Sequence, residues 1–249
     1  MKSFGGSVAC VPSKPAISAH RRDEAGLTGL GDAAGSGAEY VEIDIRRTGD
    51  GRLVVHHDPE IGGLRLNRLS YARVQDLAPR PVPLVSDAMD VIAGRAKGHL
   101  DLKERGCEHE TVALAVEAFG RDGFVVTTRE VSSLFEIKKS FPGVRTALSV
   151  GRNLWERGAA HDFAPLRLIR RAGADMVALN HRLARVGVLR QCGRAGIPAM
   201  IWTVNAEPVM RRFLGDPRVA VLVTDHPGTA LTLRDAGDGA DVRARRAQS

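Results

Sequence analysis

The sequence predicts a (β/α)₈ TIM barrel, a single domain in which eight parallel strands alternate with helices. Short apolar runs alternate with helical patterns along nearly the whole chain, which indicates a parallel sheet. The length of 249 residues suits one such barrel. No Gly-x-Gly-x-x-Gly pattern follows the first apolar run, so the dinucleotide sites common in open sheets are not indicated. An open, doubly wound sheet is the alternative fold.

The expected barrel strands are short apolar runs bounded by polar or turn residues. They are Ala16–Ala19, Tyr40–Ile45, His99–Leu102, Phe124–Thr127, Arg145–Ser149, Met176–Leu179, Ala199–Trp202 and Ala220–Val223. A further run, Leu53–His56, follows Asp50-Gly51, a pair that favours a tight turn. We therefore expect this run to form a β-hairpin extension with the second strand.

Helical patterns lie between the strands and end at glycine or proline, the usual stop signals. The expected helices are residues 113–119, Val131–Ser140, Pro165–Ala172, Leu183–Arg194 and Glu207–Leu214. We expect one barrel domain, residues 15–236, after an N-terminal extension, residues 1–14. The last residues, 237–249, are rich in arginine and are expected to form a basic, disordered tail.

The composition of the chain indicates which partners the protein binds and in which cell compartment it is found. The net charge of +7 favours anionic partners, but the basic residues are spread along the chain and aromatic residues make up only 4%, so nucleic acid is not expected. Cys10, Cys107 and Cys192 are far apart and odd in number, which indicates unpaired thiols. The chain has no long uncharged apolar stretch, and its first residues lack the apolar core of a secretory signal. We therefore expect a cytoplasmic protein.

Polar side chains gather where the predicted strands end, which is the face on which barrel enzymes place their active sites. These residues are His20, Arg21, Glu42, Asp44, His57, Asp58, Asp101, Lys103, Thr127, Thr128, Ser149, Asn180, His181, Trp202, Asn205, Thr224 and Asp225. Other histidines, among them His99, show no ligand spacing and are expected to be surface or packing residues.

Glu42 and Asp44 are two residues apart on a strand, so their side chains point to the same face. Apolar residues occupy the opposite face, which places both carboxylates inside the barrel. Two buried carboxylates repel each other unless a cation lies between them, and oxygen ligands suit Mg²⁺ or Ca²⁺. Asp101, on the next barrel strand, can complete the set of metal ligands.

Lys103 follows Asp101 by two residues and shares its face. A lysine beside a metal repels it unless an anion lies between them, and a phosphate bound by Lys103, Arg21 and the metal would fill that place. His20 and His57 can then act as a general base and a general acid, because imidazole titrates near neutral pH. Asp58 follows His57 directly, and it could have either a catalytic role or a structural role at the strand end.

Several motifs together resemble those of the glycerophosphodiester phosphodiesterase family, within the phosphatidylinositol-phospholipase-C-like phosphodiesterase superfamily. They are His20-Arg21, Glu42-x-Asp44, Thr48-Gly49-Asp50-Gly51, Val54-Val55-His56-His57-Asp58, Asp101-x-Lys103, Trp202-Thr203-Val204-Asn205 and Thr224-Asp225-His226-Pro227. The resemblance extends from about residue 15 to about residue 235. It implies a barrel that hydrolyses glycerophosphodiesters, compounds of lipid metabolism, to an alcohol and glycerol phosphate.

The resemblance also implies a role for each matching residue. Glu42, Asp44 and Asp101 would hold one divalent cation, and His20 and His57 would act as acid and base. The substrate-binding residues would be Arg21 and Lys103, which would bind the phosphate, and Trp202, which would form a wall of the pocket. The substrate is then a small-molecule or lipid phosphodiester, and a lipid would bring transient contact with a membrane surface. The oligomeric state is left open.

The chain departs from the family pattern at four points. Arg22 replaces the usual glycine after His-Arg, and the usual Pro-Glu-Asn-Thr segment is missing. The third ligand is Asp101 where the family usually has glutamate, and the insertion before the third strand is reduced to Pro59–Pro83. Two alternatives follow: a sphingomyelinase D-like phospholipase or lyase that gives a cyclic phosphate, and a catalytically inactive barrel that binds anions.

Overall fold

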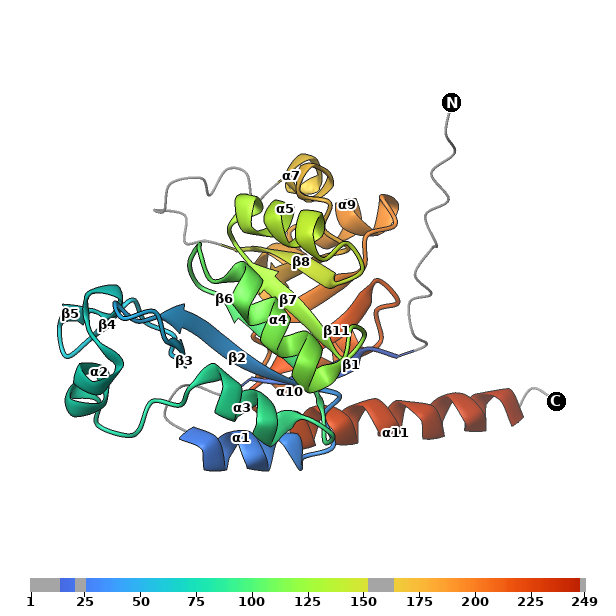
Figure 1. Cartoon of the computed structure of the whole chain (residues 1–249). Helices are drawn as coiled ribbons and strands as arrows, with labels where there is room; N and C mark the ends of the chain where they lie inside the picture. The colour runs from blue at the N-terminus through green and yellow to red at the C-terminus, as the bar shows by residue number, and fades with distance from the viewer. Residues whose placement is uncertain (1–13, 21–25, 152–163, 247–249) are drawn as a thin grey trace.

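The structure, a computed structural model, describes residues 14–20, 26–151 and 164–246. Eight parallel strands form a closed barrel (Figure 1). In spatial order they are β1 (Ala16–Ala19), β2 (Tyr40–Arg47), β6 (Lys97–Leu102), β7 (Phe124–Thr128), β8 (Arg145–Val150), β9 (Met176–Asn180), β10 (Ala199–Trp202) and β11 (Val219–Thr224). Strand β1 pairs with both β2 and β11, which closes the ring. The predicted barrel is confirmed, and the open sheet is ruled out.

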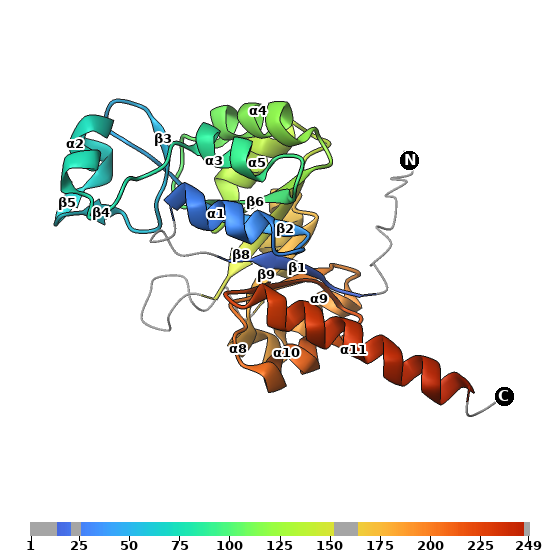
Figure 2. The same ribbon diagram turned by 90° about the horizontal axis from the view of Figure 1, so that it is seen from below.

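Helices cover the outside of the barrel, as Figure 2 shows from below. They are α1 (Gly26–Ala34), α3 (Val85–Ile92), α4 (Glu108–Phe119), α5 (Val131–Ser140), α7 (Leu166–Ala172), α8 (His181–Arg185), α9 (Val188–Arg194), α10 (Glu207–Leu214) and α11 (Pro227–Arg246). The prediction of one long helix over Leu183–Arg194 is wrong. Two helices occupy this segment, because Gly187 adopts a φ of +105° that an α-helix does not accommodate. Helix α11 runs past residue 236, and the domain boundaries stay predictions.

The hairpin extension forms as expected and carries a small lobe beside the barrel (Figure 1). Strand β3 (Leu53–Val55) pairs antiparallel with β2, and Gly51, at a φ of +88°, allows the turn between them. The lobe consists of β4 (Glu60–Ile61), β5 (Leu64–Arg65), a 3₁₀ helix η2 (Leu66–Arg68) and α2 (Tyr71–Leu77). It encloses a small apolar cluster that includes Leu66 and Val74.

The inside of the barrel changes character along the strands. Nearer the strand starts it is filled by an apolar cluster that includes Tyr40, Val125 and Met200. Glu42 follows Tyr40 by two residues and Thr127 follows Val125 by two, so each faces the same interior further along its strand. Polar groups are thus held at the carboxyl end of the barrel above an apolar floor.

Two sequence predictions concern the chain as a whole. Cys107 and Cys192 are buried free thiols, as expected, and Cys10 lies outside the described residues. Among the helices of the described segments, none is both long and apolar enough to cross a membrane.

Candidate active site

A cavity of about 850 Å³ opens at the carboxyl ends of the barrel strands. Seven of the eight predicted site residues line it: His20, Glu42, Asp44, His57, Asp101, Lys103 and Trp202. The eighth, Arg21, lies outside the described residues. The two histidines and the three carboxylates that the sequence separates by up to 81 positions therefore share one cavity.

Three carboxylates lie together on β2 and β6. Glu42, Asp44 and Asp101 each present an oxygen within 4.8 Å of the oxygens of the other two. The register of the sheet produces this arrangement, because Asp44 lies directly opposite Asp101. Glu42 and Asp44 are each only 3% exposed. This oxygen-only set can hold a hard metal ion.

The electrostatics of this cluster favour a bound cation. Burial, and next the charge of Asp44, raise the pKa of Glu42 well above its ordinary value. Glu42 Oε2 and Asp44 Oδ1 are buried and accept no hydrogen bond, although Asp44 Oδ1 is in an ion pair with Lys103. Buried anionic oxygens without hydrogen bonds are costly, and a divalent cation would satisfy both. The residues present therefore fit a metal ion.

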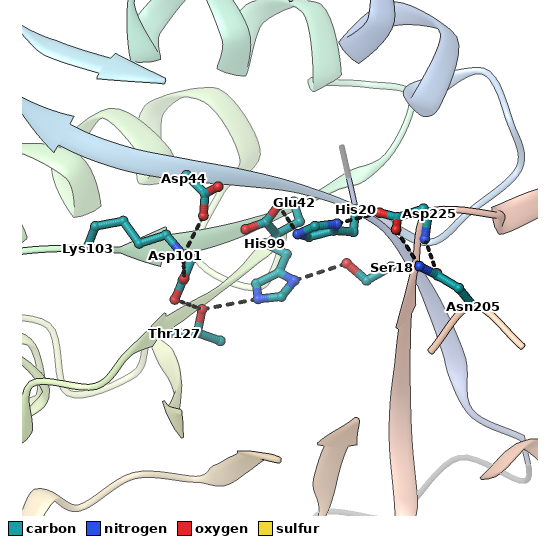
Figure 3. Close-up of polar contacts among 10 residues, drawn as sticks. All are labelled: Ser18, His20, Glu42, Asp44, His99, Asp101, Lys103, Thr127, Asn205 and Asp225. Carbon is teal, nitrogen blue, oxygen red and sulfur yellow. Dashed lines mark hydrogen bonds and ion pairs between the residues drawn. The ribbon is translucent and has the colours of Figure 1, made fainter. Parts of the chain in front are cut away.

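Lys103 partly neutralises the cluster (Figure 3). Its Nζ lies 2.7 Å from Asp44 Oδ1 and donates a hydrogen bond of 2.5 Å to Asp101 Oδ2. Burial alone would lower the pKa of Lys103, but the charges of Asp101 and Asp44 outweigh it and raise that pKa. When all three carboxylates are ionised, they and the one ammonium group leave two negative charges, which match the charge of a divalent cation.

His20 is held by a pair of residues from the far end of the chain (Figure 3). Its Nδ1 lies 2.6 Å from Asp225 Oδ1, and its Nε2 lies 3.9 Å from Glu42 Oε2. Asn205 in turn donates from Nδ2 to Asp225 Oδ2 at 2.5 Å and accepts from the Asp225 backbone N–H at 3.0 Å. An ionised carboxylate only accepts hydrogen bonds, so His20 carries a proton on Nδ1 and presents Nε2 towards the carboxylate cluster.

His57 occupies a more open part of the cavity. Its side chain is 60% exposed, and its Nδ1 pairs with Asp58 Oδ1 at 2.8 Å. The hydrogen bond from His57 lowers the pKa of Asp58. Arg46 Nε donates to the His57 backbone carbonyl at 2.8 Å and so ties this loop to β2. Asp58, for which the sequence allowed either a structural or a catalytic role, lines the same cavity.

The sequence predicted a surface or packing residue at His99, and the structure shows that its buried side chain also belongs to the cavity. His99 lines the cavity and is 4% exposed, with Ser18 Oγ 3.0 Å from Nδ1 and Thr127 Oγ1 3.1 Å from Nε2. Thr127 Oγ1 in turn donates to Asp101 Oδ1 at 2.6 Å. Burial lowers the pKa of His99 to about 4. Its position two residues before Asp101, on the same strand face, was the signal that could have revealed it.

The remaining walls come from Trp202 and from the lobe. Trp202 lies at the end of β10, with the guanidinium carbon of Arg129 5.8 Å from its ring centroid. Ile61 of the lobe and residues 78–82, which follow α2, form the wall on that side. The reduced insertion therefore still shapes the cavity.

Comparison with known protein families finds a match over part of the chain. Residues 17–88 match the model of the Glycerophosphoryl diester phosphodiesterase family, a segment that contains His20, Glu42, Asp44 and His57. No curated protein matches the chain in sequence. This family lies in the phosphatidylinositol-phospholipase-C-like superfamily.

Solved structures match the fold over nearly the whole chain. A glycerophosphodiester phosphodiesterase from Parabacteroides distasonis is 17% identical, with a TM-score of 0.76 over 90% of this chain and 98% of that one. An Oleispira antarctica phosphodiesterase in complex with the product sn-glycerol-3-phosphate is 19% identical, with a TM-score of 0.70 over 89% and 97%. A Thermotoga maritima glycerophosphodiester phosphodiesterase is 19% identical, with a TM-score of 0.67 over 88% and 98%. The chain thus has the barrel of these proteins.

Proposed function

We propose that this chain, which carries the sequence pattern and the barrel of the glycerophosphodiester phosphodiesterases, hydrolyses glycerophosphodiesters to an alcohol and glycerol phosphate. The family match gives the enzyme class, a phosphoric diester hydrolase. The observation that carries the proposal is that one cavity contains three carboxylates within 4.8 Å together with His20 and His57. The glycerol phosphate bound to the Oleispira neighbour supports the same substrate class.

Glu42, Asp44 and Asp101 are the proposed ligands of one divalent cation, Mg²⁺ or Ca²⁺. When bound, it would stabilise the negative charge on the non-bridging oxygens of the phosphate. Lys103 extends from the same cluster and supplies a fixed positive charge for those oxygens. Arg21 is the proposed second phosphate ligand and stays a prediction from the sequence.

The two histidines divide the proton transfers. In the proposed reaction His20 removes a proton at Nε2 from the attacking hydroxyl, because Asp225 holds Nδ1 in its protonated form. His57, in the open part of the cavity, donates a proton to the oxygen of the departing alcohol. If a neighbouring glycerol hydroxyl attacks first, the product is a cyclic phosphate. Water then opens it while the histidines exchange roles. Trp202 forms the wall against which the substrate lies.

A second candidate is a sphingomyelinase D-like lyase that releases the cyclic phosphate as its product. Two features favour the lyase. One is Asp101 in place of glutamate, and the other is the short lobe that contains η2 and α2. Product analysis separates the two candidates. Glycerol 3-phosphate supports hydrolysis, and a cyclic phosphate that persists supports the lyase.

The test is an assay of the wild type and His57→Ala against a panel of glycerophosphodiesters and lysophospholipids, with Mg²⁺, with Ca²⁺ and with EDTA. We expect metal-dependent turnover by the wild type, and a loss of about 10²-fold or more in His57→Ala. His109→Ala is the matched control, because His109 lies on α4 outside the cavity. Turnover that survives both EDTA and His57→Ala would contradict the mechanism. No turnover of any diester by the wild type would support an inactive, anion-binding barrel.

A further inference from the structure

A chain of hydrogen bonds crosses the inside of the barrel beneath the carboxylate cluster (Figure 3). It connects Ser18 on β1, His99 on β6, Thr127 on β7 and the Asp101 carboxylate. Ser18, His99 and Thr127 are all buried, at 0%, 4% and 2% exposure. Strand β2 lies between β1 and β6 in the sheet, so the bond from Ser18 to His99 spans the interior instead of joining neighbouring strands.

The direction of these hydrogen bonds follows from the donors available. The Thr127 hydroxyl has one hydrogen, and it is donated to Asp101 Oδ1 at 2.6 Å. Thr127 Oγ1 therefore accepts its second hydrogen bond, from a hydrogen on His99 Nε2. Ser18 partners the other ring nitrogen, so both edges of the imidazole are engaged and the ring has one orientation.

Asp101 is consequently held at both oxygens by different partners. Thr127 binds Oδ1, and Lys103 Nζ binds Oδ2 at 2.5 Å. Asp101 and Thr127 lie opposite each other in the paired strands β6 and β7, which puts the hydroxyl within reach of the short aspartate side chain. A glutamate would extend one methylene further into the cavity, and its carboxylate would then lie beyond the hydrogen bond from Thr127. The hydroxyl thus suits the aspartate that replaces the family's usual glutamate.

We propose that His99 is a positioning residue that acts through Thr127 to set the orientation of Asp101 as a ligand of the divalent cation. This inference rests on the proposed function only in that it requires the cation site. Partners behind metal ligands commonly affect metal affinity by about 10–100-fold. His99 and Thr127 therefore belong to the site, although neither contacts the cation or the substrate.

The test compares the binding of Mg²⁺ and of Ca²⁺ to the full-length protein by isothermal titration calorimetry. We expect Thr127→Val to raise the Kd by about 10-fold or more, and Thr127→Ser, which keeps the hydroxyl, to stay within about twofold of the wild type. Thr128→Val is the matched control, since Thr128 is also buried on the same strand but its hydroxyl accepts from the Glu130 backbone N–H instead of bonding Asp101. Circular dichroism and thermal unfolding verify that each variant is folded.

A double-mutant cycle then tests whether His99 acts through Thr127. His99→Phe keeps a ring in the space and removes both nitrogens, so we expect it to weaken metal binding by several-fold. If the proposal is right, the double variant His99→Phe/Thr127→Val binds the metal no more weakly than Thr127→Val alone. Nitrogen-15 NMR of the His99 ring, assigned by comparison with His99→Phe, should show a proton on Nε2.

Three outcomes would overturn the inference. One is a folded Thr127→Val protein with the wild-type Kd, and another is fully additive losses in the cycle. The third is an unprotonated Nε2. In each case the wild type still binds the metal, so the proposed function stands. A wild type that binds neither Mg²⁺ nor Ca²⁺ would instead refute the cation site, and with it both proposals. Thr127→Val and Thr127→Ser decide the question even if His99→Phe does not fold.

Discussion

His20 and Asp225 are 205 positions apart in the sequence, yet His20 Nδ1 lies 2.6 Å from Asp225 Oδ1. The contact exists because the first strand of the barrel pairs with the last, with Ala19 opposite Thr224. The His20 backbone N–H also donates to the Thr224 carbonyl at 2.9 Å. The closure of the ring therefore creates the partner that orients this imidazole.

Replacing Asp225 tests this relationship. We expect Asp225→Asn to lower kcat by about 10²-fold or more, because an amide no longer selects the form of His20 with the proton on Nδ1. The affinity for the metal should be nearly unchanged, since Asp225 is not among the three clustered carboxylates. Steady-state kinetics and metal titration measure the two effects. Asp235→Asn, at an exposed carboxylate on α11, is the control. An equal loss of kcat in Asp225→Asn and Asp235→Asn would contradict the proposed role of Asp225 in orienting His20.

Glu42→Gln should make the metal-free protein more stable. The pKa of Glu42 is raised in the folded state, so protonation favours folding at low pH, and that contribution is lost as the pH rises above the ordinary value of 4.5. Glutamine avoids the cost of ionising this buried group. In EDTA at pH 8 we expect a higher Tm for the variant, where 1 kcal/mol corresponds to about 2–4 °C. Mg²⁺ should no longer raise that Tm. A gain in Tm that is just as large at pH 4.5 would argue against this explanation.

His99 has the opposite effect on the pH dependence of stability. Its pKa is about 4 in the folded protein and about 6.5 when unfolded, so the unfolded chain binds more protons between these values. Stability should therefore fall as the pH falls from 6.5 to 4, by at most about 3 kcal/mol from this group. Urea unfolding in EDTA at several pH values measures the slope. The slope of the unfolding free energy against pH should become less steep in His99→Asn, because asparagine does not titrate. An unchanged slope would show that His99 is not the group responsible.

Lys103→Met should destabilise the metal-free protein. Asp44 and Asp101 would then lose the ammonium group that both contact, and breaking a buried ion pair costs about 3–5 kcal/mol. Chemical unfolding in EDTA measures this change. Arg211→Met, which breaks an exposed pair with Glu207, is the control and should cost about 1 kcal/mol or less. Equal costs for the two variants would show that the Lys103 pairs contribute no more than a surface pair.

Much of the fold and part of the site follow from local sequence patterns. The strand predicted at Ala199–Trp202 and the helices at Val131–Ser140 and Glu207–Leu214 agree with the structure at both ends. Alternation along a strand was sufficient to place Glu42 and Asp44 on one interior face. These features depend only on residues a few positions apart, and the sequence displays that spacing directly.

The sequence by itself therefore determined the barrel, the carboxylates of the cavity and the two histidines on its rim. Only the tertiary structure decided what those residues touch: Ser18 against His99 across the barrel, Lys103 between Asp44 and Asp101, and Asp225 behind His20. Side-chain periodicity is a local property of the backbone. Contacts across a closed barrel depend instead on strand register and on the closure of the ring, which arise only when all eight strands have paired.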